Sequence, residues 1–260
     1  DNPIQGASFG IYDNSDILIE ELTTNENGLA VSAEYVFGDY YLKELSTLPQ
    51  YLLLSEDILF SIDQNDITIP IDLVNNLKRG CMKINKTGDY EINGVNENIP
   101  LPGTEFEVRL KNSDALIETI ITDDLGVATS SNLPYGIYTV SESATPFGYI
   151  LSQPFDVNID TDGETQSFDI ENKAIRSNIT IIKNDIDTGL PVLIAGTEFK
   201  IMDSDGIYII QNGIDTFTTD DVGSVTLDLP LYLGQYTLHE ISSPYGYYID
   251  ETPIPFSVDE

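Results

Sequence analysis

The stretch Gly136-Ile-Tyr-Thr-Val-Ser-Glu142 decides the fold of this chain, and it recurs as Gly38-Asp-Tyr-Tyr-Leu-Lys-Glu44 and Gly234-Gln-Tyr-Thr-Leu-His-Glu240. Side chains of a β-strand alternate between its two faces, so the shared tyrosine, the aliphatic residue and the glutamate lie on one face. The apolar residues make that face the inner one. A carboxylate there is unfavourable unless it is paired or protonated, so the repeated glutamate indicates chemistry inside a domain core.

The glutamates are evenly spaced, because Glu44 lies 98 residues before Glu142 and Glu142 lies 98 residues before Glu240. A period of this length is typical of a domain array, since solenoid repeats are shorter. Short runs of Val, Ile, Tyr, Phe and Thr alternate with Gly, Asp, Asn and Pro turns, which favours β-sandwiches. The sequence therefore predicts an all-β chain of three immunoglobulin-like sandwiches, over residues 1–78, 79–175 and 176–260, in an elongated array.

The composition excludes several classes of partner. The 260 residues include 11 basic and 44 acidic side chains, for a formal net charge of −33. This charge repels the phosphates of nucleic acids and anionic membrane surfaces. One cysteine allows no intramolecular disulfide, and no apolar run is long enough to span a bilayer. The first residues show no signal-peptide pattern, so we expect the chain to be part of a longer protein.

Two further polar side chains fall on inner faces of predicted strands. Lys86 follows Met82 and Ile84 at alternate positions, and Asn172 follows Phe168 and Ile170 in the same way. In an immunoglobulin-like sandwich the first and last strands can lie side by side. We therefore expect the lysine, the asparagine and the glutamate of the middle domain to meet in its core.

Burial of such a group predicts a reaction. Desolvation lowers the pKa of an amine and raises that of a carboxyl, which leaves a neutral nucleophile beside a proton donor. Lys86 would attack the side-chain carbonyl of Asn172, and Glu142 would move the protons and help ammonia leave. The product is an isopeptide bond that closes a long loop, worth about 4–5 kcal/mol by analogy with disulfides.

The ordered landmarks resemble the Cna protein B-type (SpaA-like) repeat domains of Gram-positive adhesins and pilins. The matching stretches of the middle domain lie at residues 86–87, 102–106, 122–126 and 138–149, with Asn172 after them. The resemblance implies a β-sandwich fold and a Lys–Asn bond assisted by an acidic residue. It gives these roles to Lys86, Asn172 and Glu142, and gives Glu44 and Glu240 the equivalent acidic role.

The outer copies depart from the pattern. The first has Glu44 and Asn75, but its lysine strand would precede residue 1; the third has Lys183 and Glu240, but its asparagine strand would follow residue 260. Both outer domains are therefore expected to be incomplete. We predict one bond, in the middle domain, with Asn75 and Lys183 unpaired in this chain.

The sequence thus predicts a structural stalk segment of a Gram-positive cell-wall surface protein, extracellular and monomeric, whose partners are the neighbouring domains of its parent chain. The alternatives are a module that binds a host matrix protein or glycan, and a pilin subunit assembled by sortase. A hydrolase triad lacks a second base, because His239 is the only histidine, so no enzyme is predicted. No cofactor is expected, and residues 158–169 read as a hairpin in preference to a calcium loop.

Overall fold

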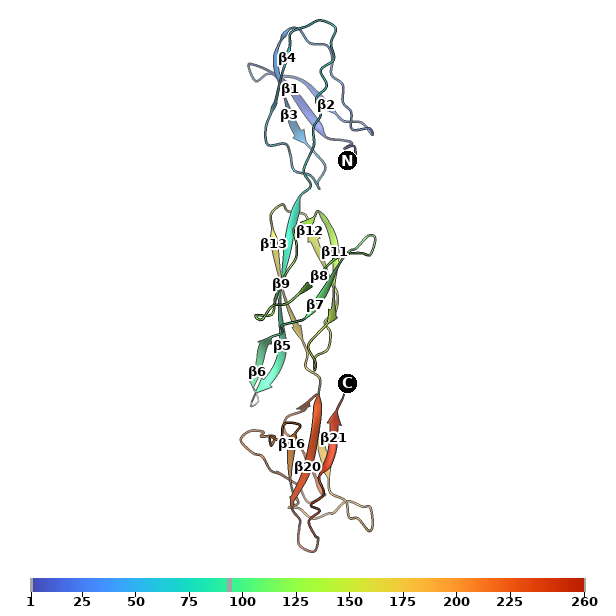
Figure 1. Cartoon of the computed structure of the whole chain (residues 1–260), viewed down its shortest axis with the longest axis vertical. Helices are drawn as coiled ribbons and strands as arrows, with labels where there is room; N and C mark the ends of the chain where they lie inside the picture. The colour runs from blue at the N-terminus through green and yellow to red at the C-terminus, as the bar shows by residue number, and fades with distance from the viewer. Residues whose placement is uncertain (1, 93–94, 260) are drawn as a thin grey trace.

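The computed structural model describes residues 2–92 and 95–259, and within them the regular structure is entirely β. Figure 1 shows three domains that follow one another along the long axis of the molecule. Each has its own cluster of buried apolar side chains. The predicted all-β architecture of three tandem sandwich domains is therefore confirmed.

Domain 1 contains an antiparallel sheet in the order β2-β1-β3-β4. Its strands are β1 (Ser8–Asp13), β2 (Leu18–Thr23), β3 (Gly38–Ser46) and β4 (Ile58–Ile62). Strand β3 contains the first of the three repeated stretches, and its alternate residues Tyr40, Leu42 and Glu44 are buried. The alternation of side chains along a strand thus places the glutamate beside the core, as the sequence predicts.

Domain 2 is a sandwich of two sheets. The first has the path β10-β5-β13, with β6 and β9 also paired to β5, and the second has the order β12-β11-β7-β8. The strands of the first sheet are β5 (Arg79–Ile92), β6 (Val95–Pro100), β9 (Val127–Thr129), β10 (Leu133–Pro134) and β13 (Thr165–Asn172). Those of the second are β7 (Glu105–Leu110), β8 (Ala115–Ile121), β11 (Gly136–Ala144) and β12 (Phe155–Ile159).

Domain 3 repeats the second sheet of domain 2 in the order β17-β16-β20-β21, beside two short strand pairs, β14-β19 and β15-β18. The strands of the sheet are β16 (Glu198–Asp203), β17 (Phe217–Thr218), β20 (Gly234–Ser242) and β21 (Ile254–Val258). The short strands are β14 (Arg176–Ser177), β15 (Thr180–Ile182), β18 (Ser224–Thr226) and β19 (Leu231–Tyr232). The described residues contain no counterpart of β13 in this domain.

The first and last strands of domain 2 are neighbours. Strands β5 and β13 run parallel, and their register joins Cys81 to Thr165 at one end and Gly88 to Asn172 at the other. Side chains of Met82, Ile84 and Lys86 enter the core from β5 with alternate spacing. The pairing therefore places the asparagine at the end of β13 close to the lysine of β5.

A β-bulge follows the repeated glutamate in all three domains. In domain 2, Glu142 pairs with Phe106 but Ala144 pairs with Glu105, so one residue of β11 is extra. The same shift occurs next to Glu44 in β3 and next to Glu240 in β20. A bulge changes the phase of side-chain alternation, so the residues after it point differently from those that simple period-two counting predicts.

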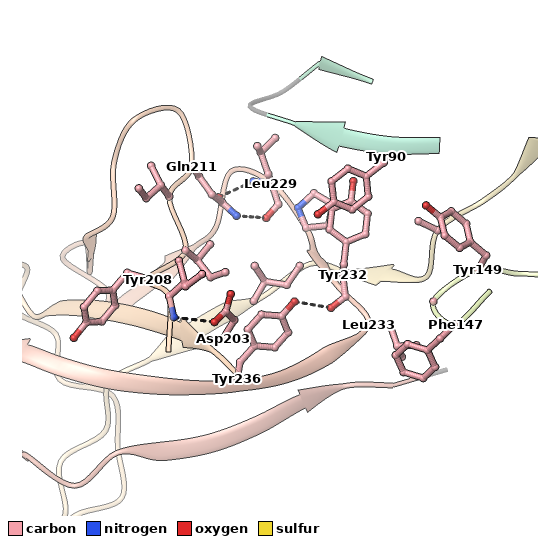
Figure 2. A pocket seen from close by; sticks show the side chains of 17 residues that line it. Tyr90, Phe147, Tyr149, Asp203, Tyr208, Gln211, Leu229, Tyr232, Leu233 and Tyr236 are labelled. Atoms are coloured by element: carbon pink, nitrogen blue, oxygen red, sulfur yellow. Dashed lines mark hydrogen bonds between the residues drawn. The ribbon is translucent and has the colours of Figure 1, made fainter. Parts of the chain in front are cut away.

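The sequence analysis missed a hairpin at the junction of domains 2 and 3. Strand β5 continues past Lys86 to pair with β6, and the extension reaches domain 3, where Tyr90 stacks on Tyr232 with ring centroids 4.5 Å apart. Buried Asp89 accepts a hydrogen bond of 2.6 Å from the backbone of Ala174 in the connecting segment. A pocket of about 530 Å³ lies beside this contact, lined by aromatic side chains from both domains (Figure 2).

Candidate functional site

The centre of the candidate site is Lys86, a fully buried side chain with 1% of its surface exposed. Strand alternation turns it inward after Met82 and Ile84, and its backbone is held by a hydrogen bond of 2.7 Å from its N–H to the carbonyl of Gly126. A lysine without exposed surface requires polar partners or a neutral amine. Its surroundings supply three oxygen atoms.

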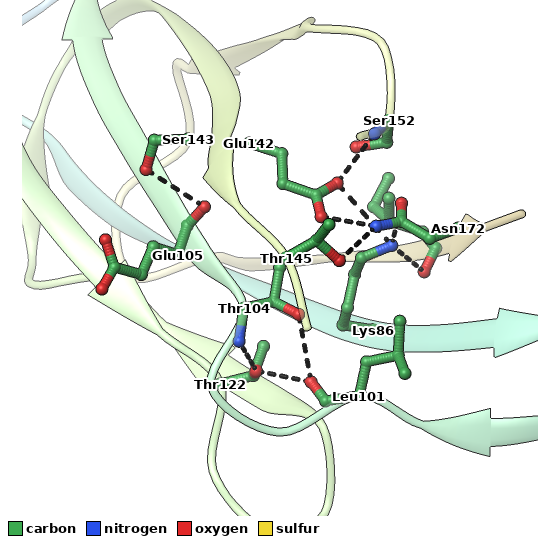
Figure 3. A network of polar contacts seen from close by, with 11 residues as sticks. Lys86, Leu101, Thr104, Glu105, Thr122, Glu142, Ser143, Thr145, Ser152 and Asn172 are labelled. Atoms are coloured by element: carbon green, nitrogen blue, oxygen red, sulfur yellow. Dashed lines mark hydrogen bonds and ion pairs between the residues drawn. The ribbon is translucent and has the colours of Figure 1, made fainter. Parts of the chain in front are cut away.

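The amide of Asn172 lies against this amine. Lys86 Nζ donates to Asn172 Oδ1 at 2.5 Å, and also to the backbone carbonyl of Ile170 at 3.4 Å. The asparagine itself is 1% exposed. Figure 3 shows the two side chains meeting end to end, from adjacent strands. The nucleophilic nitrogen is therefore already beside the carbonyl group that it would attack.

The carboxylate of Glu142 faces both nitrogen atoms. Its Oε1 accepts a hydrogen bond of 2.5 Å from Asn172 Nδ2, and its Oε2 lies 3.8 Å from Lys86 Nζ. The backbone N–H of Ser152 donates to the same Oε2 at 2.8 Å and fixes the carboxylate (Figure 3). The side chains of the ion pair have no exposed surface. One carboxylate thus lies against both the amine of the lysine and the amide nitrogen of the asparagine.

Burial changes the acidity of the lysine. Desolvation lowers the pKa of Lys86 from 10.5 to about 8, and the negative charges of Glu142 and Glu171 oppose this shift without cancelling it. Desolvation dominates because the amine has lost its water on all sides. A substantial fraction of the amine is therefore neutral, and able to act as a nucleophile, at mildly alkaline pH.

The outer domains hold two of the three groups each. In domain 1, Asn75 Nδ2 donates to both oxygens of Glu44, at 2.9 and 2.8 Å, and to the carbonyl of Leu52 at 2.9 Å. In domain 3, Lys183 Nζ donates to Glu240 Oε2 at 2.6 Å. The structure thus brings each predicted site residue to the glutamate of its own domain, and brings all three groups together in domain 2.

The sequence analysis missed a hydroxyl in the site. Asn172 Nδ2 also donates to Thr145 Oγ1, at 2.8 Å, so both hydrogens of the amide nitrogen are used. Thr145 stands three positions after Glu142, which by simple alternation is the opposite face of the strand. The bulge after Glu142 brings it back to the inner side. A signal was present, since Thr47 and Ser243 occupy the same position after Glu44 and Glu240.

The hairpin predicted at residues 158–169 is wrong, because β12 pairs with β11 and β13 pairs with β5, so this segment connects the two sheets of domain 2. Asp162 Oδ1 accepts from the backbone of Arg79 at 2.9 Å, and Asn158 Nδ2 donates to Asp160 at 2.7 Å. Across residues 2–92 and 95–259 there is no group of three or more His, Cys, Asp and Glu side chains placed to hold a metal ion. The same ranges contain no helix with the length and hydrophobicity needed to span a membrane.

The fold and this buried trio define a class of tandem β-sandwich domains with a Lys–Glu–Asn core. The family model described as SpaA, prealbumin-like fold domain, matches residues 1–77, 83–174 and 177–260. The chain belongs to this family, which accounts for nearly all of its length. The resemblance inferred from the sequence landmarks is therefore confirmed at the level of the family.

Two relatives match this chain over part of their own length. The trypsin-resistant surface T6 protein of Streptococcus pyogenes serotype M6 is 40% identical over 76 residues, which are 29% of this chain and 14% of that protein. The structure of the Bacillus anthracis TIE protein matches all of this chain with a TM-score of 0.80 and 26% identity, over 46% of its own length. The chain therefore spans less than half of either relative.

A third comparison concerns the fold. BcpA, the major pilin subunit of Bacillus cereus, matches the whole chain and 92% of its own length, with a TM-score of 0.53 and 15% identity. At this identity the likeness establishes a shared architecture of domains.

Proposed function

We propose that this chain is a stalk segment of a Gram-positive cell-surface adhesin or pilus protein, and that domain 2 is locked by an isopeptide bond between Lys86 and Asn172. Membership of the SpaA family and the surface location named for the streptococcal relative support the stalk role. The observation that supports the bond is the buried contact of 2.5 Å between Lys86 Nζ and Asn172 Oδ1, spanned by Glu142.

The atoms of this reaction balance without a cofactor. Neutral Lys86 Nζ attacks Cγ of Asn172, a C–N bond forms, and negative charge develops on Oδ1. Glu142 takes a proton from Nζ through Oε2 and gives one to Nδ2 through Oε1, after which the Cγ–Nδ2 bond breaks and ammonia leaves. The hydrogen bond of 2.5 Å from Nδ2 to Oε1 places the proton donor at the leaving group. Fixed packing supplies the proximity, which is worth up to roughly 7–11 kcal/mol.

The position of the bond suits a molecule under tension. Force enters domain 2 at the N-terminal end of β5 and leaves at the C-terminal end of β13, and these parallel strands are neighbours. A bond from residue 86, within β5, to residue 172, at the C-terminal end of β13, connects these two strands directly. The residues between them then lie outside the path of the force, and the domain cannot be pulled open. Because one chain reacts once with itself, the reaction is not enzymatic turnover.

The intact mass of the full chain under denaturing conditions tests the proposal. The expected mass is lower than the sequence mass by one ammonia. Glu142→Ala should restore the full mass, because the carboxylate that moves the protons is gone. Glu240→Ala is the matched control, since it removes the equivalent carboxylate from domain 3 and should leave the deficit of one ammonia unchanged. A wild-type chain with the full sequence mass would show that the Lys86–Asn172 bond does not form.

A further inference from the structure

The position three residues after each repeated glutamate holds a hydroxyl in all three domains: Thr47, Thr145 and Ser243. The β-bulge that follows each glutamate turns this residue toward the glutamate side of the strand. We propose that this hydroxyl is a fourth member of the cross-linking site, and that in domain 2 Thr145 orients the amide of Asn172 and holds its nitrogen as it leaves. The inference rests on the proposed Lys86–Asn172 bond.

The first observation is the geometry around the amide in domain 2. Asn172 Nδ2 donates one hydrogen to Glu142 Oε1 at 2.5 Å and the other to Thr145 Oγ1 at 2.8 Å, while Oδ1 accepts from Lys86. Both hydrogens of the amide nitrogen and one lone pair of its oxygen are thereby specified. The oxygen cannot exchange places with the nitrogen, so the carbonyl stays turned toward the amine (Figure 3).

The second observation comes from domain 3, where the described residues include no asparagine at this place. There Ser243 Oγ donates a hydrogen bond to Glu240 Oε1, while Lys183 holds Oε2 of the same carboxylate. In domain 2 the corresponding oxygen, Oε1 of Glu142, receives the amide of the asparagine. The serine hydroxyl and the lysine amine thus each bind one oxygen of the carboxylate and keep it oriented.

The third observation is the hydroxyl of domain 1. Thr47 Oγ1 is buried and has no hydrogen-bond partner among the described residues. The amide of Asn75 instead donates to Glu44 and to the carbonyl of Leu52. A buried hydroxyl without a partner is unfavourable. In domain 1 the asparagine thus uses the carbonyl of Leu52 in place of the hydroxyl, so the contact between hydroxyl and amide is made in domain 2, where the lysine, the glutamate and the asparagine meet.

The chemistry explains why this contact would accelerate the reaction. As the C–N bond breaks, Nδ2 gains a proton and positive charge, so its hydrogen bond to Thr145 becomes charge-assisted. Such bonds are about twice as strong as neutral ones. An interaction that strengthens between the ground state and the transition state lowers the barrier. The gain in strength is worth about one ordinary hydrogen bond, so removal of the hydroxyl predicts a roughly two- to tenfold slower reaction.

The test follows bond formation in the full chain made by cell-free synthesis, with timed samples stopped in denaturant and weighed by mass spectrometry. Thr145→Val keeps the shape and removes the hydroxyl, and should slow the loss of ammonia two- to tenfold. Thr145→Ser restores the hydroxyl and should restore the rate. Thr104→Val is the matched control, because Thr104 is buried in the same network but its hydroxyl contacts the carbonyl of Leu101.

The outcomes separate the two proposals. A Thr145→Val chain that cross-links at the wild-type rate would overturn the role of the hydroxyl while leaving the bond in place. A Thr145→Ser chain as slow as Thr145→Val would do the same, because restoring the hydroxyl would then fail to restore the rate. A wild-type chain that loses no ammonia would overturn the cross-link itself, and with it this inference.

Discussion

The replacement of Lys86 by methionine should convert domain 2 from an inextensible unit into one that unfolds under force. Methionine is an apolar side chain of similar length, so it fills the buried site without the nucleophile. Domain 1 indicates that the remaining polar groups can satisfy each other, since Glu44 and Asn75 are hydrogen-bonded at 2.8 and 2.9 Å without a lysine. The loss of the covalent bond is then the main effect of the substitution.

The structure gives the length of chain that the Lys86→Met substitution should release under force. Lys86 and Asn172 are 86 residues apart in sequence, and an extended chain spans about 3.3–3.6 Å per residue. The Lys86→Met chain should therefore release about 280–310 Å when domain 2 unfolds, whereas the wild-type chain should release none of this length. The loop-entropy model adds about 4–5 kcal/mol of stability for the bond, which corresponds to a roughly 15–40 °C lower unfolding midpoint for the variant domain.

Single-molecule stretching of the full chain, with handles at its two ends, measures the released length. Lys183→Met serves as the control, because it removes the equivalent amine from domain 3 and should leave domain 2 inextensible. The steps from domains 1 and 3 provide an internal reference in every trace. A wild-type chain that releases the same additional length as the Lys86→Met chain would refute the reasoning.

Three further experiments probe the site and the junction. The rate of ammonia loss should fall about tenfold for each pH unit below about pH 8 and should level off above pH 8. The reason is that the pKa of Lys86 is lowered to about 8 and only the neutral amine attacks. A rate independent of pH would contradict this. In a Lys86→Met background, Gly126→Ala should lower the free energy of unfolding in urea by about 1–3 kcal/mol, because a Cβ at φ +73° would lie 2.4 Å from the carbonyl of residue 86. Gly163→Ala is the control, since Gly163 has a similar φ of +72° but open space around it, and it should lower the free energy of unfolding less. Tyr90→Ala removes a ring stacked at 4.5 Å on Tyr232, worth about 0.5–1.5 kcal/mol, and should broaden spin-label distances between domains 2 and 3 without changing the unfolding midpoint of domain 2.

The positions of the three polar groups of the site could be predicted because each follows buried or half-buried apolar residues at alternate positions of its own strand. Met82, Ile84 and Lys86 alternate along β5, and all three are buried as period-two counting requires. The adjacency of β5 and β13 is a property of the sandwich as a whole, and local patterns suggested it only through the assumed immunoglobulin-like topology. The approach of Lys86 to Asn172 therefore required both a local and a global argument.

The hydroxyl of Thr145 could not be found by the same counting. An odd separation from Glu142 predicts the opposite face, and only the register shift between Glu142 and Ala144 reverses this assignment. A bulge depends on how two strands pair, so a single strand sequence does not reveal it. The hairpin of β5 and β6 was missed for a related reason, since the corresponding turn after Lys183 in domain 3 is much shorter and forms only the isolated bridge between Asn184 and Pro191, so the repeat gave little guide.

The parallel pairing of β5 with β13 also constrains how domain 2 is made. Strand β5 begins at residue 79 and its neighbour ends at residue 172, so a chain that emerges from its N-terminus exposes one edge of β5 until the last strand arrives. An open edge is a template for strands of other molecules. The speed of synthesis, relative to encounters with other unfinished chains, therefore affects whether the domain closes on itself.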